Sequence, residues 1–301
     1  MTAVSRTAQF AKVFKVLKKH YQAVRPDPQR PVSEHLLLGC CLEDAPYEAA
    51  DEVFAGLVHT FFDWNEVRVS SIAELSEVMA RLPDPRAAAN RLKRVLQSVF
   101  EETYAFDLEE CRKKNLGPTV KWLHKMDGTT NFVVSYVVQS ALGGHAIPID
   151  SGVLRALHIV ELVSEEDLEA AVVPGLERAI AKAKGIEFGS MLHQLGADFT
   201  ANPYSPTVRK ILLEINPDAS DQLPKRRARK KAEPADPPKP AAAKSAAEGK
   251  KTSGKESSSK AKKKAATGRK KAAKGKAAET PPDSKAAKKS AAAGLSKRKP
   301  R

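Results

Sequence analysis

The sequence predicts an all-α protein, with a multi-helix bundle over residues 1–223 and a disordered basic tail over residues 224–301. Two observations lead to this prediction. Apolar residues in 1–223 recur every three to four positions, as on one face of an amphipathic helix, and strand-like alternation is scarce. The tail has no aromatic residue, no Val, Ile or Met, and a single Leu, so it buries too little apolar area to offset the entropy of ordering.

Charge divides the chain at the same place. The 301 residues carry 51 Lys/Arg and 36 Asp/Glu, but residues 224–301 hold 27 basic and 6 acidic residues, whereas residues 1–223 hold 24 and 30. The tail is therefore +21 and the body −6. Basic blocks without interleaved aromatic residues favour contact with DNA phosphates over reading of bases, and the composition resembles linker-histone tails. The alternative for the tail is a solubilising linker.

Several classes of protein are excluded. No apolar run approaches the roughly 20 residues that cross a bilayer, and the N-terminal segment has Lys and Arg where a secretory signal would be apolar. We expect a DNA-associated protein of the cytoplasm, nucleoid or nucleus that does not bind membranes. Three cysteines, with Cys40 and Cys41 adjacent on an apolar helix, predict buried thiols and not a disulfide framework. The seven histidines lack metal-ligand spacing, so no metal site is predicted.

The helices follow in order from the periodicity and from their capping residues. Ser71 to Glu74 and Ser164 to Asp167 have the pattern of capping boxes, and Asp84 before Pro85 that of an N-cap. Residues 61–70 fit either a helix or a strand. Helices are expected at about 6–23, 33–42, 46–61, 72–81, 85–105, 107–115, 118–126, 130–142, 151–162, 165–183, 187–196 and 205–214.

The segment 125–160 differs from the rest. A tight turn at Asp127-Gly128-Thr129 precedes an apolar helix, and a Gly143-Gly144 break and a short extended piece lead to Asp150 at the start of the next helix. Backbone N–H groups at such a turn can bind phosphate, and Asp150 is placed to cap the helix that it precedes. Gly128, Thr129 and Thr130 are therefore the predicted DNA-phosphate contacts, with helix capping as the alternative for the two threonines.

This segment resembles the helix-hairpin-helix DNA glycosylase superfamily, in particular endonuclease III-like members. Residues 126–130 take the place of the family's hairpin, Ile149-Asp150-Ser151-Gly152 that of its catalytic turn, and Arg155 follows the aspartate at the family's distance. The resemblance extends over roughly residues 6–214. It implies a helix-hairpin-helix motif, DNA as partner, and a catalytic role for Asp150.

The departures from the family pattern restrict the chemistry. Phe132 stands where bifunctional members carry their Lys nucleophile, so no Lys-dependent lyase chemistry is expected. Thr130 replaces the second hairpin glycine, and Asp44 replaces the glutamine that fills the gap left by a flipped base. The four positions of the family's iron–sulfur ligands hold no cysteine, so no cofactor is expected: Asp198, Ser205, Val208 and Glu214.

Three functions remain open. The first is a monofunctional DNA N-glycosylase, in which Asp150 stabilises an oxocarbenium-like transition state and the flipped base is lined by Trp122, Phe132 and Tyr136. The second is a catalytically inactive glycosylase-fold protein that binds DNA as a nucleoid or chromatin factor. In the third, the body binds protein partners and only the tail contacts DNA. The retained spacing from Asp150 to Arg155 favours the enzyme slightly, with helix capping as the alternative role of Asp150.

Overall fold

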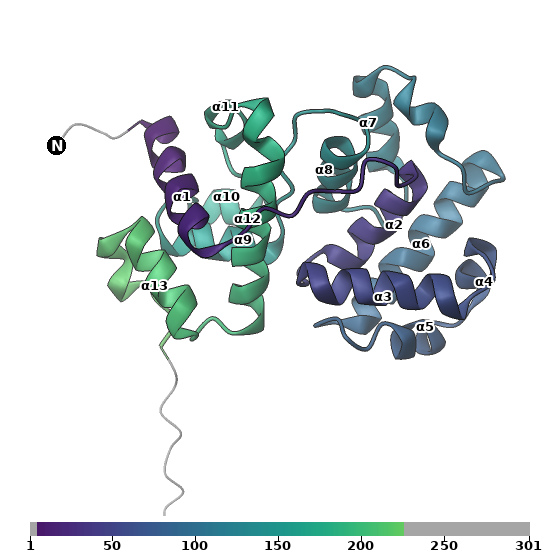
Figure 1. Cartoon of the computed structure of the whole chain (residues 1–301), viewed down its shortest axis with the longest axis horizontal. Coiled ribbons are helices and arrows are strands. Elements are labelled where there is room, and N and C mark those ends of the chain that lie inside the picture. The colour runs from purple at the N-terminus through teal and green to yellow at the C-terminus, as the bar shows by residue number, and fades with distance from the viewer. Residues whose placement is uncertain (1–4, 226–301) are drawn as a thin grey trace, which may run out of the picture. The chain divides into compact units, whose positions relative to one another are not determined.

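The computed structural model describes residues 5–225, and within them the chain forms thirteen α-helices, two short 3-10 helices and no strand (Figure 1). The predicted all-α class is confirmed. The disorder predicted for the tail falls, apart from Pro224 and Lys225, outside the described residues. No helix of the described part is both long enough and apolar enough to cross a membrane.

The helices enclose two hydrophobic cores, which define two lobes (Figure 1). The first lobe is continuous in sequence, whereas the second combines the N-terminal helix with the C-terminal helices. The first lobe contains α2 (Val32–Leu42), α3 (Tyr47–Thr60), α4 (Trp64–Val69), α5 (Ile72–Val78), α6 (Pro85–Thr103), the 3-10 helix Glu109–Arg112, α7 (Leu116–Lys125) and α8 (Asn131–Ser140). The second contains α1 (Arg6–His20), α9 (Ser151–Ile159), α10 (Glu165–Glu169), α11 (Leu176–Ala179), α12 (Lys182–Ala201), α13 (Pro206–Ile215) and the 3-10 helix Pro217–Asp221.

The predicted capping residues begin the helices expected of them. Ser71 and Glu74 form a complete capping box on α5, Ser164 and Asp167 form one on α10, and Asp84 caps α6 ahead of Pro85. Each cap satisfies backbone N–H groups that the first turn of a helix leaves without partners. Local sequence therefore fixes these helix starts.

Two predicted elements are corrected, and one that the sequence left open is resolved. The single helix expected over 165–183 is wrong, because the chain turns at Ala171 and Gly175, which have φ of 53° and 77°, and leaves only α10 and α11. The ambiguous segment 61–70 forms α4, with the Asp63 side chain accepting from Glu66 N–H. The helix expected at 107–115 is reduced to the 3-10 turn Glu109–Arg112.

The two adjacent cysteines are part of the first core, as the sequence predicted. Cys40 and Cys41 have no exposed surface. Burial disfavours the thiolate, which raises the pKa of Cys40 to about 12 and that of Cys41 further. Both residues act as small apolar side chains of α2.

Candidate functional site

The hairpin between α7 and α8 packs directly on α6. Gly128 has a φ of 89°, and a Cβ added there would lie 2.7 Å from Arg94 Cβ and 2.9 Å from the carbonyl oxygen of Arg91. A glycine is therefore needed both for the left-handed backbone and for the close approach of the hairpin to α6. This packing role exists whether or not the turn also binds phosphate.

Both hairpin threonines have partners inside the chain. Thr129 Oγ1 donates toward the carbonyl oxygens of Leu123 and Met126, at 2.8 and 2.9 Å. Thr130 Oγ1 accepts from Val133 N–H at 3.1 Å and donates to Glu43 Oε2 at 2.9 Å. Thr130 is thus the N-cap of α8, the alternative role that the sequence left open.

Two carboxylates flank the hairpin, and arginines of α6 pair with both. Asp127 is exposed and bound by the guanidinium of Arg94, with Nε at 2.7 Å, and this hydrogen bond is the main cause that lowers the pKa of Asp127. Glu43 lies 2.9 Å from Arg91 Nη1. Its pKa is raised, because burial outweighs the attraction of Arg91. The turn predicted to hold phosphate therefore carries negative charge of its own.

Asp150 caps α9 and pairs with a histidine from α12. Its Oδ1 accepts from Val153 N–H at 2.8 Å, and its Oδ2 lies 2.8 Å from His193 Nδ1. His193 Nε2 donates to the carbonyl oxygen of Ala45 at 2.9 Å, since a carbonyl only accepts. Because the proton on Nε2 points at Ala45, the hydrogen bond between His193 Nδ1 and Asp150 Oδ2 requires a second proton, which belongs to either His193 or Asp150. The Asp150 side chain has no exposed surface and that of His193 only 2%, so the pair is sealed inside the protein.

Aromatic rings and two glycines pack around the Asp150–His193 pair. The rings of Tyr47 and Phe132 lie 5.0 and 5.3 Å from the His193 ring, measured between centroids. Where α9 crosses α12, a Cβ added to Gly152 would overlap the carbonyl oxygen of Gly196, and one added to Gly196 would lie 2.8 Å from Asp150 Oδ1. The helices thus approach closely enough to leave no room beside the carboxylate.

Asp44 and Arg155 act at the start of α9. Asp44 has a φ of 60°, and its Oδ1 accepts from Ser151 Oγ at 2.8 Å and from Gly152 N–H at 3.3 Å. Arg155 Nη2 lies 3.1 Å from Ser151 Oγ and its guanidinium lies over the Phe199 ring. The acidic residue at the base-filling position therefore ties the first lobe to α9.

The three residues predicted to line a base pocket do not share a cavity in the described part of the chain. Trp122 is half-buried at a surface hollow beside Cys111. Tyr136 lines a cavity of about 170 Å³ with Tyr47. Phe132 is 2% exposed, stacks with Tyr136, and lines neither cavity.

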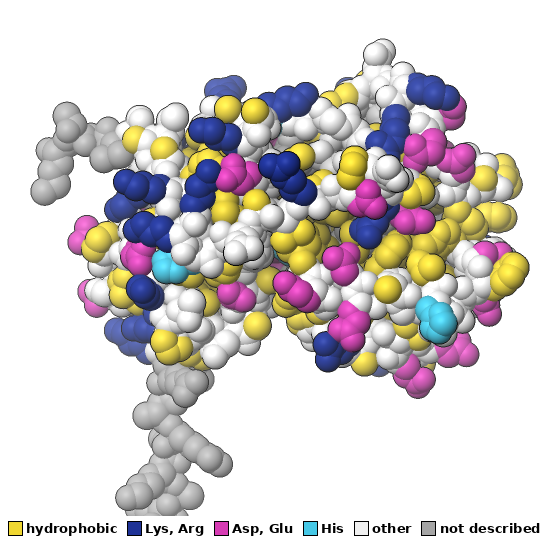
Figure 2. Space-filling view, in the orientation of Figure 1, with side chains coloured by type: hydrophobic (Ala, Val, Ile, Leu, Met, Phe, Trp, Pro, Cys, Tyr) yellow, Lys and Arg dark blue, Asp and Glu magenta, His cyan; other side chains and the backbone are white. Residues whose placement is uncertain are grey.

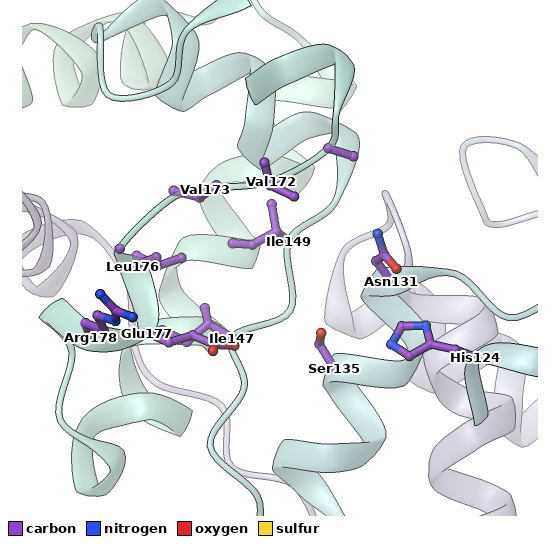
Figure 3. Close-up of a pocket in the computed structure, with 12 residues that line it drawn as sticks. His124, Asn131, Ser135, Ile147, Ile149, Val172, Val173, Leu176, Glu177 and Arg178 are labelled. Carbon is purple, nitrogen blue, oxygen red and sulfur yellow. The ribbon is translucent and has the colours of Figure 1, made fainter. Parts of the chain in front are cut away.

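Another cavity, of about 470 Å³, lies between α7 and α8 on one side and the loop joining α10 to α11 on the other (Figure 3). Asp150 does not line it, although its neighbour Ile149 does. Sequence reasoning missed this cavity, and the signal that could have found it is the pair Asn131 and Ser135, polar and four residues apart on an otherwise apolar helix. The lining residues are His124, Asn131, Ser135, Ile147, Ile149, Ala171, Val172, Val173, Gly175, Leu176, Glu177 and Arg178.

Two positions matched to the family's cluster ligands hold the second lobe together. Asp198 Oδ2 accepts from the Tyr21 hydroxyl at 2.8 Å, and burial together with this carboxylate raises the pKa of Tyr21. Glu214 pairs with Lys19 and His20 at 3.3 Å each. Asp198 therefore connects α12 to Tyr21, the residue after α1, and Glu214 connects α13 to the last two residues of α1.

The fold is shared with solved DNA glycosylases. Known protein-family models and curated protein sequences give no match to this chain. A non-covalent endonuclease III–DNA complex superposes with a TM-score of 0.52 at 17% identity, over 73% of this chain and 99% of that one. A trapped endonuclease III–DNA covalent intermediate gives 0.47 at 15% identity (63% and 85% covered), and a thermostable thymine-DNA glycosylase 0.44 at 14% (67% and 88%). The chain therefore shares the fold of the endonuclease III complex, which confirms the resemblance at the level of architecture.

Proposed function

We propose that this protein binds DNA on a glycosylase fold without performing glycosylase chemistry, as a nucleoid- or chromatin-associated factor. In this proposal residues 224–301, with their charge of +21, supply most of the affinity, through non-specific phosphate contacts. The fold supports DNA as the partner, and the charge of the tail supports phosphate as the group contacted.

The observation that carries the proposal is the sealed carboxyl group of Asp150. A carboxylate that stabilises an oxocarbenium-like transition state must lie against the sugar and keep an oxygen for it. Here both oxygens are occupied, by Val153 N–H and His193, and no side-chain surface is exposed. Phe132, at the position of the family's nucleophile, is likewise buried and has no nucleophilic atom.

A second candidate is a monofunctional DNA N-glycosylase. In it Asp150 leaves His193 to act as the catalytic carboxylate, Gly128, Thr129 and Thr130 hold a phosphate, and rearranged Trp122, Phe132 and Tyr136 line the base. The cavity of about 470 Å³ favours this candidate, because it lies beside Ile149, one residue from Asp150.

Base release distinguishes the two candidates. The full chain would be incubated with duplexes carrying uracil, a G·T mismatch, oxidised pyrimidine, 8-oxoguanine opposite adenine, or alkylated adenine, then treated with alkali. We expect binding to all of them and strand breaks in none. Breaks that disappear in Asp150→Asn would establish the glycosylase instead. This variant should stay folded, because Asn Oδ1 can still accept from Val153 N–H and its amide can donate to a neutral His193.

The contribution of the tail is tested by truncation. Removing residues 224–301 should reduce the affinity for DNA and lower the slope of log K against log salt, because each lost phosphate contact removes about 0.9 from that slope. An unchanged slope would contradict the role proposed for the tail.

A further inference from the structure

One face of the second lobe gathers positive charge that the chain does not neutralise. It is built from α1, α11 and the first turn of α12, and Figure 2 shows Lys and Arg side chains concentrated over these helices. We call it the α1 face. Its exposed cations, for which the described residues show no ion pair, are Lys12, Lys15, Arg178, Lys182 and Lys184.

The contact between α1 and α12 gathers like charges on this face. Lys18 Nζ lies 2.7 Å from Glu187 Oε1, and the Phe14 ring packs edge-on against the Phe188 ring, so the second turn of α12 lies against the second half of α1. Lys15 precedes Lys18 by about one turn of α1, and Lys184 precedes Glu187 by about one turn of α12, so both cations lie within one turn of this contact. Two neighbouring ammonium groups repel each other unless an anion lies between them.

The carboxylates around the α1 face do not provide that anion. Glu187 is engaged by Lys18, and Glu214 by Lys19 and His20. On the elements of the face itself, α1, α11 and the first turn of α12, Glu177 is the one acidic residue, against five exposed cations without ion pairs among the described residues. The face therefore keeps a net positive charge on a body whose total is −6.

The first lobe has the opposite arrangement. Between residues 25 and 146 there are 18 acidic and 13 basic residues. Arg91 and Arg94, the two α6 cations that contact the hairpin side, are held by Glu43 and Asp127, whereas Lys114, Lys121 and Lys125 on or just before α7 show no ion pair among the described residues. Phosphates approaching the hairpin would meet these carboxylates, whereas phosphates approaching the α1 face would meet unpaired ammonium and guanidinium groups.

We propose that the α1 face binds the phosphate backbone of DNA, and that the body contacts DNA there and not through its hairpin. This inference rests on the proposed function, since it assumes that the chain binds DNA. It assigns to α1, α11 and α12 a binding role that the sequence resemblance placed on residues 128–130. Recognition is of phosphate alone, because the aromatic side chains of α1, Phe10 and Phe14, pack on the second core and are not free to stack on bases.

The test uses the full chain and two matched triple variants. The first neutralises the α1 face: Lys12→Gln, Lys15→Gln and Lys184→Gln. The second neutralises three exposed cations on or just before α7, on the hairpin side: Lys114→Gln, Lys121→Gln and Lys125→Gln. Both lose three charges from exposed positions, and thermal unfolding would verify that both remain folded. The slope of log K against log salt is measured for each with one duplex of mixed sequence.

We expect the slope to fall by about 2 to 3 in the α1-face variant and to stay unchanged in the hairpin-side variant, because each lost phosphate contact removes about 0.9. An unchanged slope in the first variant, a fall in the second alone, or equal falls in both would overturn the inference while leaving DNA binding intact. A wild-type chain that binds no DNA would instead overturn the proposed function. A parallel titration with phosphatidylserine vesicles tests whether the α1 face binds an anionic membrane instead. If the α1-face variant lost binding to vesicles but kept its binding to DNA, the face would be assigned to membranes and the inference refuted.

Discussion

The two ends of α12 lie in opposite chemical surroundings. Toward its C-terminal half, His193 and Gly196 face α9, and the polar groups there are matched within the chain. At its N-terminal end, Lys182 and Lys184 are exposed among other cations without ion pairs in the described structure. The comparison indicates which groups of the protein are available to bind a ligand. Groups satisfied inside the chain have little left for a ligand, whereas surface charges without a partner retain their full capacity to bind one.

The largest expected effect is at the sealed end, from Gly152→Ala. The new Cβ would overlap the Gly196 carbonyl oxygen and Thr200 Oγ1, and one of these atoms is backbone that cannot rotate away. We expect a loss of about 3 kcal/mol or more in the free energy of unfolding, measured by urea titration. Gly117→Ala on α7 is the matched control, because nothing lies within 4 Å of its added Cβ, and it should not destabilise. Equal stability of the two variants would show that the α9–α12 contact is looser than described.

The next test breaks the buried pair from either side. His193→Leu leaves Asp150 Oδ2 buried without its partner, which should cost about 3 kcal/mol. Asp150→Asn should cost much less, because the amide keeps the cap on Val153 and supplies the proton between the two side chains. Urea titrations of both variants measure the difference. A milder effect for His193→Leu than for Asp150→Asn would mean that Asp150 is not held by His193, and would return the carboxylate to the catalytic candidate.

A pH experiment tests the carboxylate on the hairpin side. Burial raises the pKa of Glu43, so the folded chain holds this proton more tightly than the unfolded chain. The resulting stability is present below the unfolded pKa and is lost as the pH rises through the raised folded value. Glu43→Gln removes this dependence, so its stability relative to wild type should increase as the pH rises from about 4, near the unfolded pKa of a glutamate, through the raised folded value.

Glu74→Gln provides a control of opposite sign. Hydrogen bonds from Ser71 lower the pKa of Glu74, so its contribution is present above the unfolded pKa and lost as the pH falls. The stability of this variant relative to wild type should decrease over the same rise in pH. Parallel trends in the two variants would contradict the burial of Glu43.

The sequence predicted what depends on local chemistry. The capped starts of α5, α6 and α10 and the helical class follow from side chains within a few residues of each other. The cap that Asp150 forms on α9 follows in the same way. The resemblance in segment 125–160 also predicted the overall architecture. It could do so because the spacing between the hairpin and the turn at Asp150 is a property of one short segment.

The contacts that decide the state of the site come from distant parts of the chain. His193 is 43 residues from Asp150, and the Ala45 carbonyl oxygen that holds it belongs to a residue 148 positions before His193. No periodicity predicts such a pairing, so the sequence could propose a catalytic carboxylate but not its burial. The α1 face depends likewise on the contact between α1 and α12, helices separated by more than 160 residues. The break at Ala171 was missed because a non-glycine residue with positive φ has no strong local signal.

The smallest expected effect is at the open end of α12, from Lys184→Glu. If Lys15 and Lys184 are neighbours, the change replaces repulsion by attraction, and the free energy of unfolding should rise by a few tenths of a kcal/mol. DNA affinity should fall at the same time, since a phosphate contact becomes a phosphate repulsion. Lys184→Gln separates the two contributions, because it removes the repulsion without adding an ion pair and should lie between wild type and Lys184→Glu in both measurements. A gain in stability without a loss of affinity would support the proximity of Lys15 and Lys184 but not the use of the α1 face, whereas a loss of stability would contradict that proximity.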